Sequence, residues 1–278
     1  MLASLTDHIF AVIESDHIAV MHTRMGLFRR KIVAEKKSPL TLSTHRSNDN
    51  QHIVSTMSAL LSQLSIQGGK LEIILVDSLA HIEILPALEQ ALKTGEQLKR
   101  VQLHFQKKFG TVADQWSFSF CPAGFQQPVM AAAIDRTLLS DLRQMAATLN
   151  FKLVAVEPVL MCILRYWENR LTPQPLWLVV TRATSCSILR IELDCLTTVL
   201  QILCRKAFSG DEIRAHLTRE ALRLGESLQD KALYLFSTEK LGQSLEMQGT
   251  RLQQLHLPAT NNGDDFSDLR LLKMLVSG

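Results

Sequence analysis

Short motifs that mark common enzyme and metal sites are missing from this sequence of 278 residues. It has no Gly-x-Ser-x-Gly elbow, no Walker phosphate loop and no six-residue dinucleotide fingerprint. Its nine histidines never take a metal-ligand spacing with cysteines or carboxylates. The run Asn261–Asp265 has the composition of a calcium loop, but no suitably spaced acid follows it, and we interpret it as a disordered connection. We therefore expect no metal and no catalytic residue.

Paired cysteines are missing too. The five cysteines are odd in number and none stands in a Cys-x-x-Cys motif, so we expect buried, reduced thiols in a cytoplasmic protein. The sequence starts without the basic residues and the long apolar stretch of a signal peptide. Its most apolar stretch, 151–164, is interrupted by Lys152 and by Glu157-Pro158, so we expect no direct insertion into a membrane.

A strong excess of one charge is also absent. Thirty basic residues against 27 acidic residues give a net charge of only +3. The short basic pieces are interleaved with acids and lack aromatic companions, so we interpret them as solvated faces. These observations exclude a global attraction to nucleic acid and count against a nucleic-acid-binding protein. The basic pieces are Arg29-Arg30-Lys31, Lys36-Lys37, Lys99-Arg100 and Lys107-Lys108.

What the sequence does hold is a hydrophobic content of 46 %, enough for a substantial core. The first half opens on two expected strands around the turn Glu14-Ser15-Asp16, which has hairpin composition. A polar loop is expected at 44–50, and Gly68-Gly69 is expected to end the helix after it. The expected elements are strands at 9–13, 17–23, 30–35 and 71–76, and a helix with Ile53, Met57, Leu60, Leu61 and Leu64 on one face.

The opening pattern returns after Pro173 and Pro175. The middle predicts a polar helical stretch at 87–108 and a helix that Asp135 caps. We interpret Asp135 as this cap and Glu157 as a strand end, not as a catalytic pair. The second half predicts a helix capped by Ser209. The remaining expected strands are 115–120, 128–133, 152–156, 177–181, 185–193, 197–205 and 232–236.

Several short segments of the chain resemble the corresponding segments of a known protein family. They are 75–78 followed by 84–86, Phe109-Gly110 with Trp116, and 131–135 followed by 153–158. On these segments the chain resembles the PilM-type proteins of type IV pilus assembly and the cytoplasmic domain of the type II secretion protein L. Ala87 departs from the group, which has Trp there. The wider relatives are the actin, sugar kinase and Hsp70 superfamily.

The resemblance implies an α/β fold of duplicated actin-like (ribonuclease H-like) lobes with mixed sheets. Residues 1–174 would form the first lobe, with an inserted subdomain at about 87–134, and residues 175–278 the second. In ATP-binding members, two Asp-Ile-Gly loops organise Mg²⁺ and let backbone N–H groups approach phosphate. Here those loops and the adenosine loop are degenerate, which predicts a pseudo-ATPase without cofactor. The degenerate positions are Glu14, Ser15 and Asp16, then Thr181, Arg182, Ala183 and Ser185, and finally Ser237 and Thr238.

Two interpretations of the second hairpin remain open. Arg182, with the hydroxyls of Thr184, Ser185 and Ser187, has the chemistry of an anion site; the favoured alternative is an ordinary turn whose polar residues face solvent.

As a whole, the resemblance implies a non-catalytic scaffold peripheral to the inner membrane. It would dock the short cytoplasmic peptide of a single-span inner-membrane partner, and a homodimer is compatible with this role. The alternative function is an ATP-dependent small-molecule kinase or ATPase of the same fold.

Overall fold

The computed structural model describes residues 7–26, 30–40, 46–64, 66, 68–90, 92–121, 126–167, 170–171, 175–182, 184–193, 195–204, 208–229, 231–237 and 251–255. Ala183, Thr238 and the run Asn261–Asp265 lie outside these residues.

The first lobe is a five-stranded mixed sheet in the order β3-β2-β1-β4-β8. Because side chains alternate along β1, Ile9, Ala11 and Ile13 lie on one face of the sheet, where they pack with residues of α1 and α3 in one apolar core. Phe10 and Val12 point to the other face. The elements are β1 (Asp7–Ile13), β2 (His17–Met25), β3 (Arg30–Pro39), α1 (Arg46–Ser62), β4 (Gly69–Leu75), α3 (Arg136–Thr148) and β8 (Phe151–Pro158).

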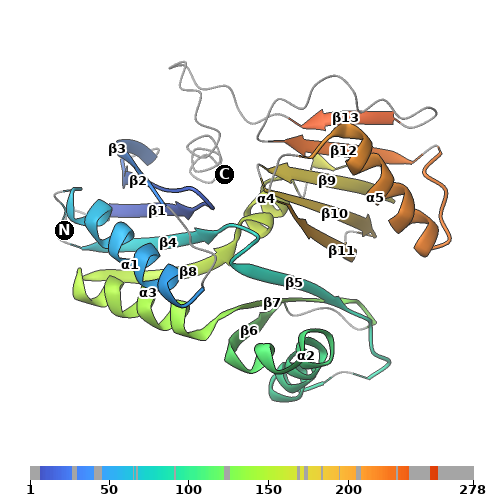
Figure 1. Cartoon of the computed structure of the whole chain (residues 1–278), viewed down its shortest axis with the longest axis horizontal. Helices are drawn as coiled ribbons and strands as arrows, with labels where there is room; N and C mark the ends of the chain where they lie inside the picture. Colours follow the sequence, from blue (N-terminus) through green and yellow to red (C-terminus); the bar gives the residue numbers. More distant parts are fainter. Residues whose placement is uncertain are drawn as a thin grey trace.

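A smaller unit is inserted between β4 and α3, and it extends below the first lobe in Figure 1. Its three strands run in the order β5-β7-β6, and α2 packs on them through Val101 and Phe105. The elements are β5 (Ala80–Leu85), α2 (Thr94–Phe109), the 3-10 helix η1 (Gly110–Gln115), β6 (Trp116–Phe120) and β7 (Val129–Asp135).

The second lobe repeats the design of the first with the strand order β11-β10-β9-β12-β13. Helix α5 covers one face of this sheet (Figure 1), where Ile213 and Leu217 join the core around Trp177. Its start is fixed by Ser209, whose hydroxyl accepts a hydrogen bond from the Glu212 N–H at 3.2 Å. The elements are β9 (Leu176–Arg182), β10 (Ser185–Glu192), β11 (Cys195–Leu203), α5 (Gly210–Arg223), β12 (Ala232–Ser237) and β13 (Arg251–Leu255).

Helix α4 (Val159–Trp167) lies between the two lobes (Figure 1). Its buried residues, among them Ile163, belong to a core that takes Phe10 and Ile74 from the first sheet and Leu178 and Tyr234 from the second. The two lobes therefore share one hydrophobic core. Among the helices of the described residues, none combines the length and hydrophobicity that crossing a bilayer requires.

Three local expectations were wrong. The polar segment 44–50 is already helical from Arg46; its residues carry no apolar period, so the sequence pattern gave no helix signal there. Helix α2 starts at Thr94 and not at residue 87. At this start the Glu96 carboxylate accepts a hydrogen bond from the Lys93 N–H at 2.9 Å. Helix α1 ends at Ser62, well before Gly68-Gly69.

The expected hairpin around Glu14-Ser15-Asp16 is confirmed, and so are the caps of α3 and α5. Strand β13 was not predicted. The lobe boundaries at 174 and 175 and the insertion at about 87–134 remain proposals; β5, which precedes residue 87, shares its sheet with β7.

Candidate functional site

The two degenerate hairpin turns meet between the lobes. The β1–β2 turn is tight, since the Glu14 N–H donates to the His17 carbonyl at 2.8 Å. It presents the Glu14 carboxylate to the Arg182 guanidinium at the end of β9, and the two form an ion pair. Both side chains are almost fully buried, at 8 % and 4 % exposure. The two turns that the family resemblance predicts to be degenerate nucleotide loops are thus joined by the protein's own charges.

A second contact lies at the end of β4. Asp77 follows that strand at 2 % exposure, and its Oδ2 accepts a hydrogen bond from the Ser185 hydroxyl of β10 at 2.7 Å. Burial raises the pKa of Asp77, and the nearby Ser185 hydroxyl and Gln201 side-chain amide oppose this rise. The Asp77 carboxyl also helps burial to raise the pKa of the neighbouring Cys186 thiol to about 12.

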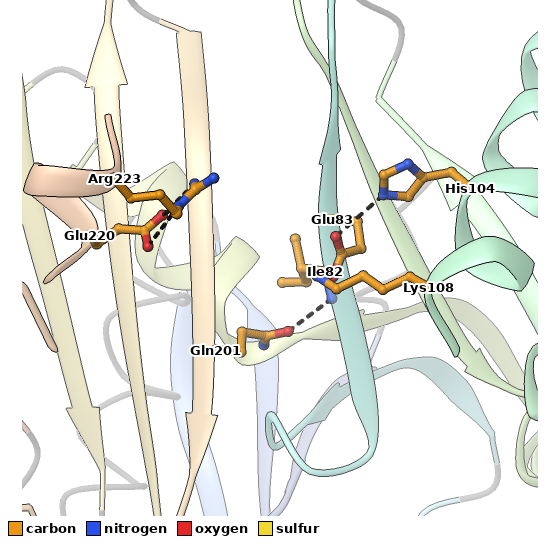
Figure 2. A network of polar contacts seen from close by, with 7 residues as sticks. All are labelled: Ile82, Glu83, His104, Lys108, Gln201, Glu220 and Arg223. Atoms are coloured by element: carbon orange, nitrogen blue, oxygen red, sulfur yellow. Dashed lines mark hydrogen bonds and ion pairs between the residues drawn. The ribbon is translucent and has the colours of Figure 1, made fainter. Parts of the chain in front are cut away.

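A third contact joins β5 of the inserted unit to β11 of the second lobe. The Ile82 backbone N–H donates to the Gln201 side-chain oxygen at 2.9 Å, as Figure 2 shows. This amide satisfies a backbone group on the outer edge of β5, which would otherwise be an open strand edge. On the next residue, Glu83 accepts from Lys108 of α2 at 2.6 Å and lies 3.3 Å from the His104 ring (Figure 2).

The remaining predicted positions divide into two groups. Thr181 pairs in register with Ser237 across β9 and β12, so these two lie beside Arg182 and Ser185. Asp16 instead turns away: its side chain is 81 % exposed and its Oδ1 lies 2.6 Å from His17 Nδ1. Ser15 is half-buried in the same turn. Glu14 is therefore the residue of the first turn that reaches the second lobe.

The favoured interpretation of the second hairpin was wrong. Its polar side chains do not face solvent, because Arg182, Ser185 and Ser187 are all buried, at 5 %, 2 % and 0 %. Tertiary packing is the cause, because this hairpin turns toward the first lobe, which covers it. The anion-site alternative is weakened as well, because Glu14 neutralises the one cation of the turn.

Asp77 and Gln201 were not predicted as site residues. Asp77 had a signal, since an acid directly after a buried strand is unusual, whereas Gln201 stands in a strand with no distinguishing pattern.

Comparison with known proteins shows which fold these lobes define. No protein-family model matches the chain, and no curated protein matches it in sequence. Solved structures do match. A Bacteroides thetaiotaomicron protein of unknown function with an actin-like ATPase fold has a TM-score of 0.61 at 12 % identity, over 87 % of this chain and 86 % of that one.

Two further structures come from secretion and pilus systems. The PilM–PilN type IV pilus biogenesis complex matches with a TM-score of 0.58 at 13 % identity, over 89 % of this chain and 88 % of that one. The cytoplasmic domain of EpsL, an inner-membrane component of the Vibrio cholerae type II secretion system, matches with 0.55 at 10 % identity, over 98 % and 96 %.

The chain therefore has an actin-like fold, as predicted. The expected resemblance to PilM-type proteins and to the cytoplasmic domain of type II secretion protein L is confirmed at the level of fold.

Proposed function

We propose that the chain is a non-catalytic cytoplasmic scaffold. It docks the short cytoplasmic tail of a single-span inner-membrane protein in a pilus-like or secretion-like assembly, and it reaches the membrane through that partner. The observation that carries the proposal is the buried Glu14–Arg182 ion pair between the two hairpin turns. The fold shared with the PilM–PilN complex and with the EpsL cytoplasmic domain supports the same role.

The ion pair disfavours nucleotide for an electrostatic reason. A phosphate entering between the turns would have to displace Glu14 from Arg182 and leave the Glu14 carboxylate buried and unpaired. Neither turn offers a glycine at the described positions to let backbone N–H groups approach phosphate. The rival function, an ATP-dependent kinase or ATPase, needs phosphate to enter between the turns and glycines that let backbone N–H groups approach it.

Isothermal titration with Mg²⁺ and ATP tests this point. We expect no saturable heat at millimolar ligand, because each missing contact costs about 1 kcal/mol or more and the losses compound. Saturable micromolar binding that is abolished by Arg182→Ala would contradict the proposal and favour the rival function.

For docking we propose the free side of β3 in the first lobe. Among the described strands β3 pairs with β2 alone, and it lies at the outer end of its sheet (Figure 1). Ile32 and Val33 are 42 % and 51 % exposed, so an extended peptide could add to the sheet and cover them. The exposed Lys31 and Lys36 disfavour pairing with a second copy, because like charges would face each other.

Flotation with inside-out inner-membrane vesicles from the native cell tests docking and does not require the partner to be identified first. We expect the chain to float with intact vesicles at low and at high salt, but not with protease-treated vesicles or with protein-free anionic liposomes. Val33→Glu should abolish flotation, whereas Val112→Glu should not; Val112 is a valine of nearly equal exposure, 48 %, on η1. Flotation with protein-free liposomes that salt removes would mean direct lipid binding and would overturn the proposal.

A further inference from the structure

Three polar contacts tie the two lobes together at separate places. They run from the β1–β2 turn to β9, from the end of β4 to β10, and from β5 to β11. The second and third join residues 108 and 119 positions apart in the sequence. All three cross between the lobes, so each would break if the lobes moved apart.

Burial makes each partner of the first contact depend on the other. An ion pair at the surface contributes little, because water and salt screen it. Glu14 and Arg182 are shielded from water, so removing one charge leaves the other buried without its ionic partner, which disfavours the closed arrangement of the lobes. Asp77 and Ser185 are equally buried, so their hydrogen bond is also protected from competition by water.

The apolar core acts in the same direction. Ile163 of α4 contacts a cluster to which both sheets contribute, through Phe10 on one side and Leu178 on the other. Opening the lobes would expose part of this surface, which costs free energy in proportion to the area.

We propose that the three contacts form a permanent lock that holds the lobes in one orientation without any ligand. In relatives that bind ATP, the resemblance implies that phosphate and Mg²⁺ connect the two turns, so that the connection depends on bound ligand. Here Glu14 and Arg182 make the connection within one chain, so it carries no cost of binding a second molecule. The chain therefore keeps a single lobe arrangement, whatever the nucleotide concentration.

Hydrogen exchange followed by mass spectrometry tests the lock. The reporter is the Ile82 N–H, which is bonded to Gln201 of the other lobe and lies in neither hairpin turn. Glu14→Gln should speed exchange of segment 80–85 by at least about tenfold, because the buried Arg182 then lacks the charge of Glu14 and the open state is favoured. Exchange in wild-type protein should not change when Mg²⁺ and ATP are added at millimolar concentration.

Glu220→Gln is the matched control. Glu220 is a carboxylate of similar burial, 9 % exposed, that pairs with Arg223 on the same helix and crosses no lobe boundary (Figure 2). It should leave exchange in 80–85 unchanged. If Glu14→Gln does not fold, Ser185→Ala removes a single hydrogen bond and should give a smaller rise in the same segment.

Faster exchange confined to the two turns, with segment 80–85 unaffected, would show that the Glu14–Arg182 ion pair acts only locally and would overturn the proposed lock. Protection of 80–85 by Mg²⁺ and ATP in wild-type protein would also overturn it. The lock can fail while flotation behaves as proposed, because docking on β3 does not need the inter-lobe contacts.

Discussion

Two acids of this protein, the buried Asp77 and the half-buried Glu226, have pKa values shifted in opposite directions by their surroundings. Asp77 accepts a hydrogen bond from the neutral Ser185 hydroxyl, and burial raises its pKa. Glu226 accepts two hydrogen bonds from the Arg190 Nε, at 2.9 and 3.1 Å, and one from its Nη2 at 2.8 Å. These bonds lower the pKa of Glu226. The two residues therefore predict opposite responses to pH.

Asp77→Asn should raise the stability of the protein near neutral pH. An acid whose pKa rises on folding stabilises the folded state only while it is protonated. As pH rises above 3.8, the ordinary pKa of an aspartic acid, Asp77 therefore lowers the stability of the folded state. Asparagine keeps an oxygen for Ser185 without the charge. The melting-temperature difference between variant and wild type should grow as pH rises from about 4, and a variant less stable than wild type at pH 7 would show that the charge is needed.

Glu226→Gln should lower the free energy of unfolding by about 2 kcal/mol at pH 7, since buried Arg190 loses its charged partner. Because the pKa of Glu226 is lowered on folding, its contribution is present near neutral pH and is lost as pH falls through that pKa. The measurement is urea denaturation at several pH values. Glu192→Gln is the control: Glu192 lies 3.6 Å from the same arginine but is 48 % exposed, so its loss should cost under about 0.5 kcal/mol.

Among the elements, the connection into β4 depends on glycine for a steric reason. Gly68 has a φ of +99°, and a Cβ there would lie 2.7 Å from the Asn150 carbonyl oxygen. Gly69 has a φ of +143°, and a Cβ would lie 2.7 Å from the Asp7 carbonyl oxygen. The pair thus lets the backbone pass close to two other segments, and it does not end α1.

Gly68→Ala and Gly95→Ala should have opposite effects. The first adds a clash with backbone at a positive φ and should cost more than about 1 kcal/mol. Gly95 lies in α2 with open space around its Cβ position, so alanine there should stabilise by up to about 1 kcal/mol. Urea denaturation measures both, and a neutral Gly68→Ala would mean that the connection relaxes freely.

The cap of α5 gives a second prediction for a single element. Ser209→Ala should cost about 1 kcal/mol, because the Glu212 N–H loses its acceptor. Ser140→Ala, at an exposed position inside α3, should be neutral or slightly stabilising, since alanine is the better helix former. Equal losses from both would remove the capping explanation.

For the whole molecule, the shared core predicts cooperative unfolding. Far-UV circular dichroism and tryptophan fluorescence should give coincident urea transitions, although Trp116 lies in the inserted unit and Trp177 in the second lobe. Ile163→Ala, at the centre of the shared core, should cost about 2–5 kcal/mol and shift both signals together. Two separated transitions would show that the lobes fold independently.

The sequence by itself determined most of the elements and their duplication, but not β13. Strands with a period of two and helices with an apolar face are local patterns, and the caps at Asp135 and Ser209 depend on residues three positions apart. The family resemblance then predicted the actin-like fold and the positions of the degenerate turns. The polar first turn of α1 was not predicted to be helical, because it carries no apolar period.

Only the tertiary structure decided what the two turns contact. Glu14 and Arg182 stand out in the sequence only as positions of the predicted nucleotide loops, and nothing local indicates that they are buried against each other. The same holds for Asp77 with Ser185 and for Gln201 with the Ile82 backbone. Each contact joins segments of different lobes, so its burial and charge pairing exist only after the two sheets have packed around α4.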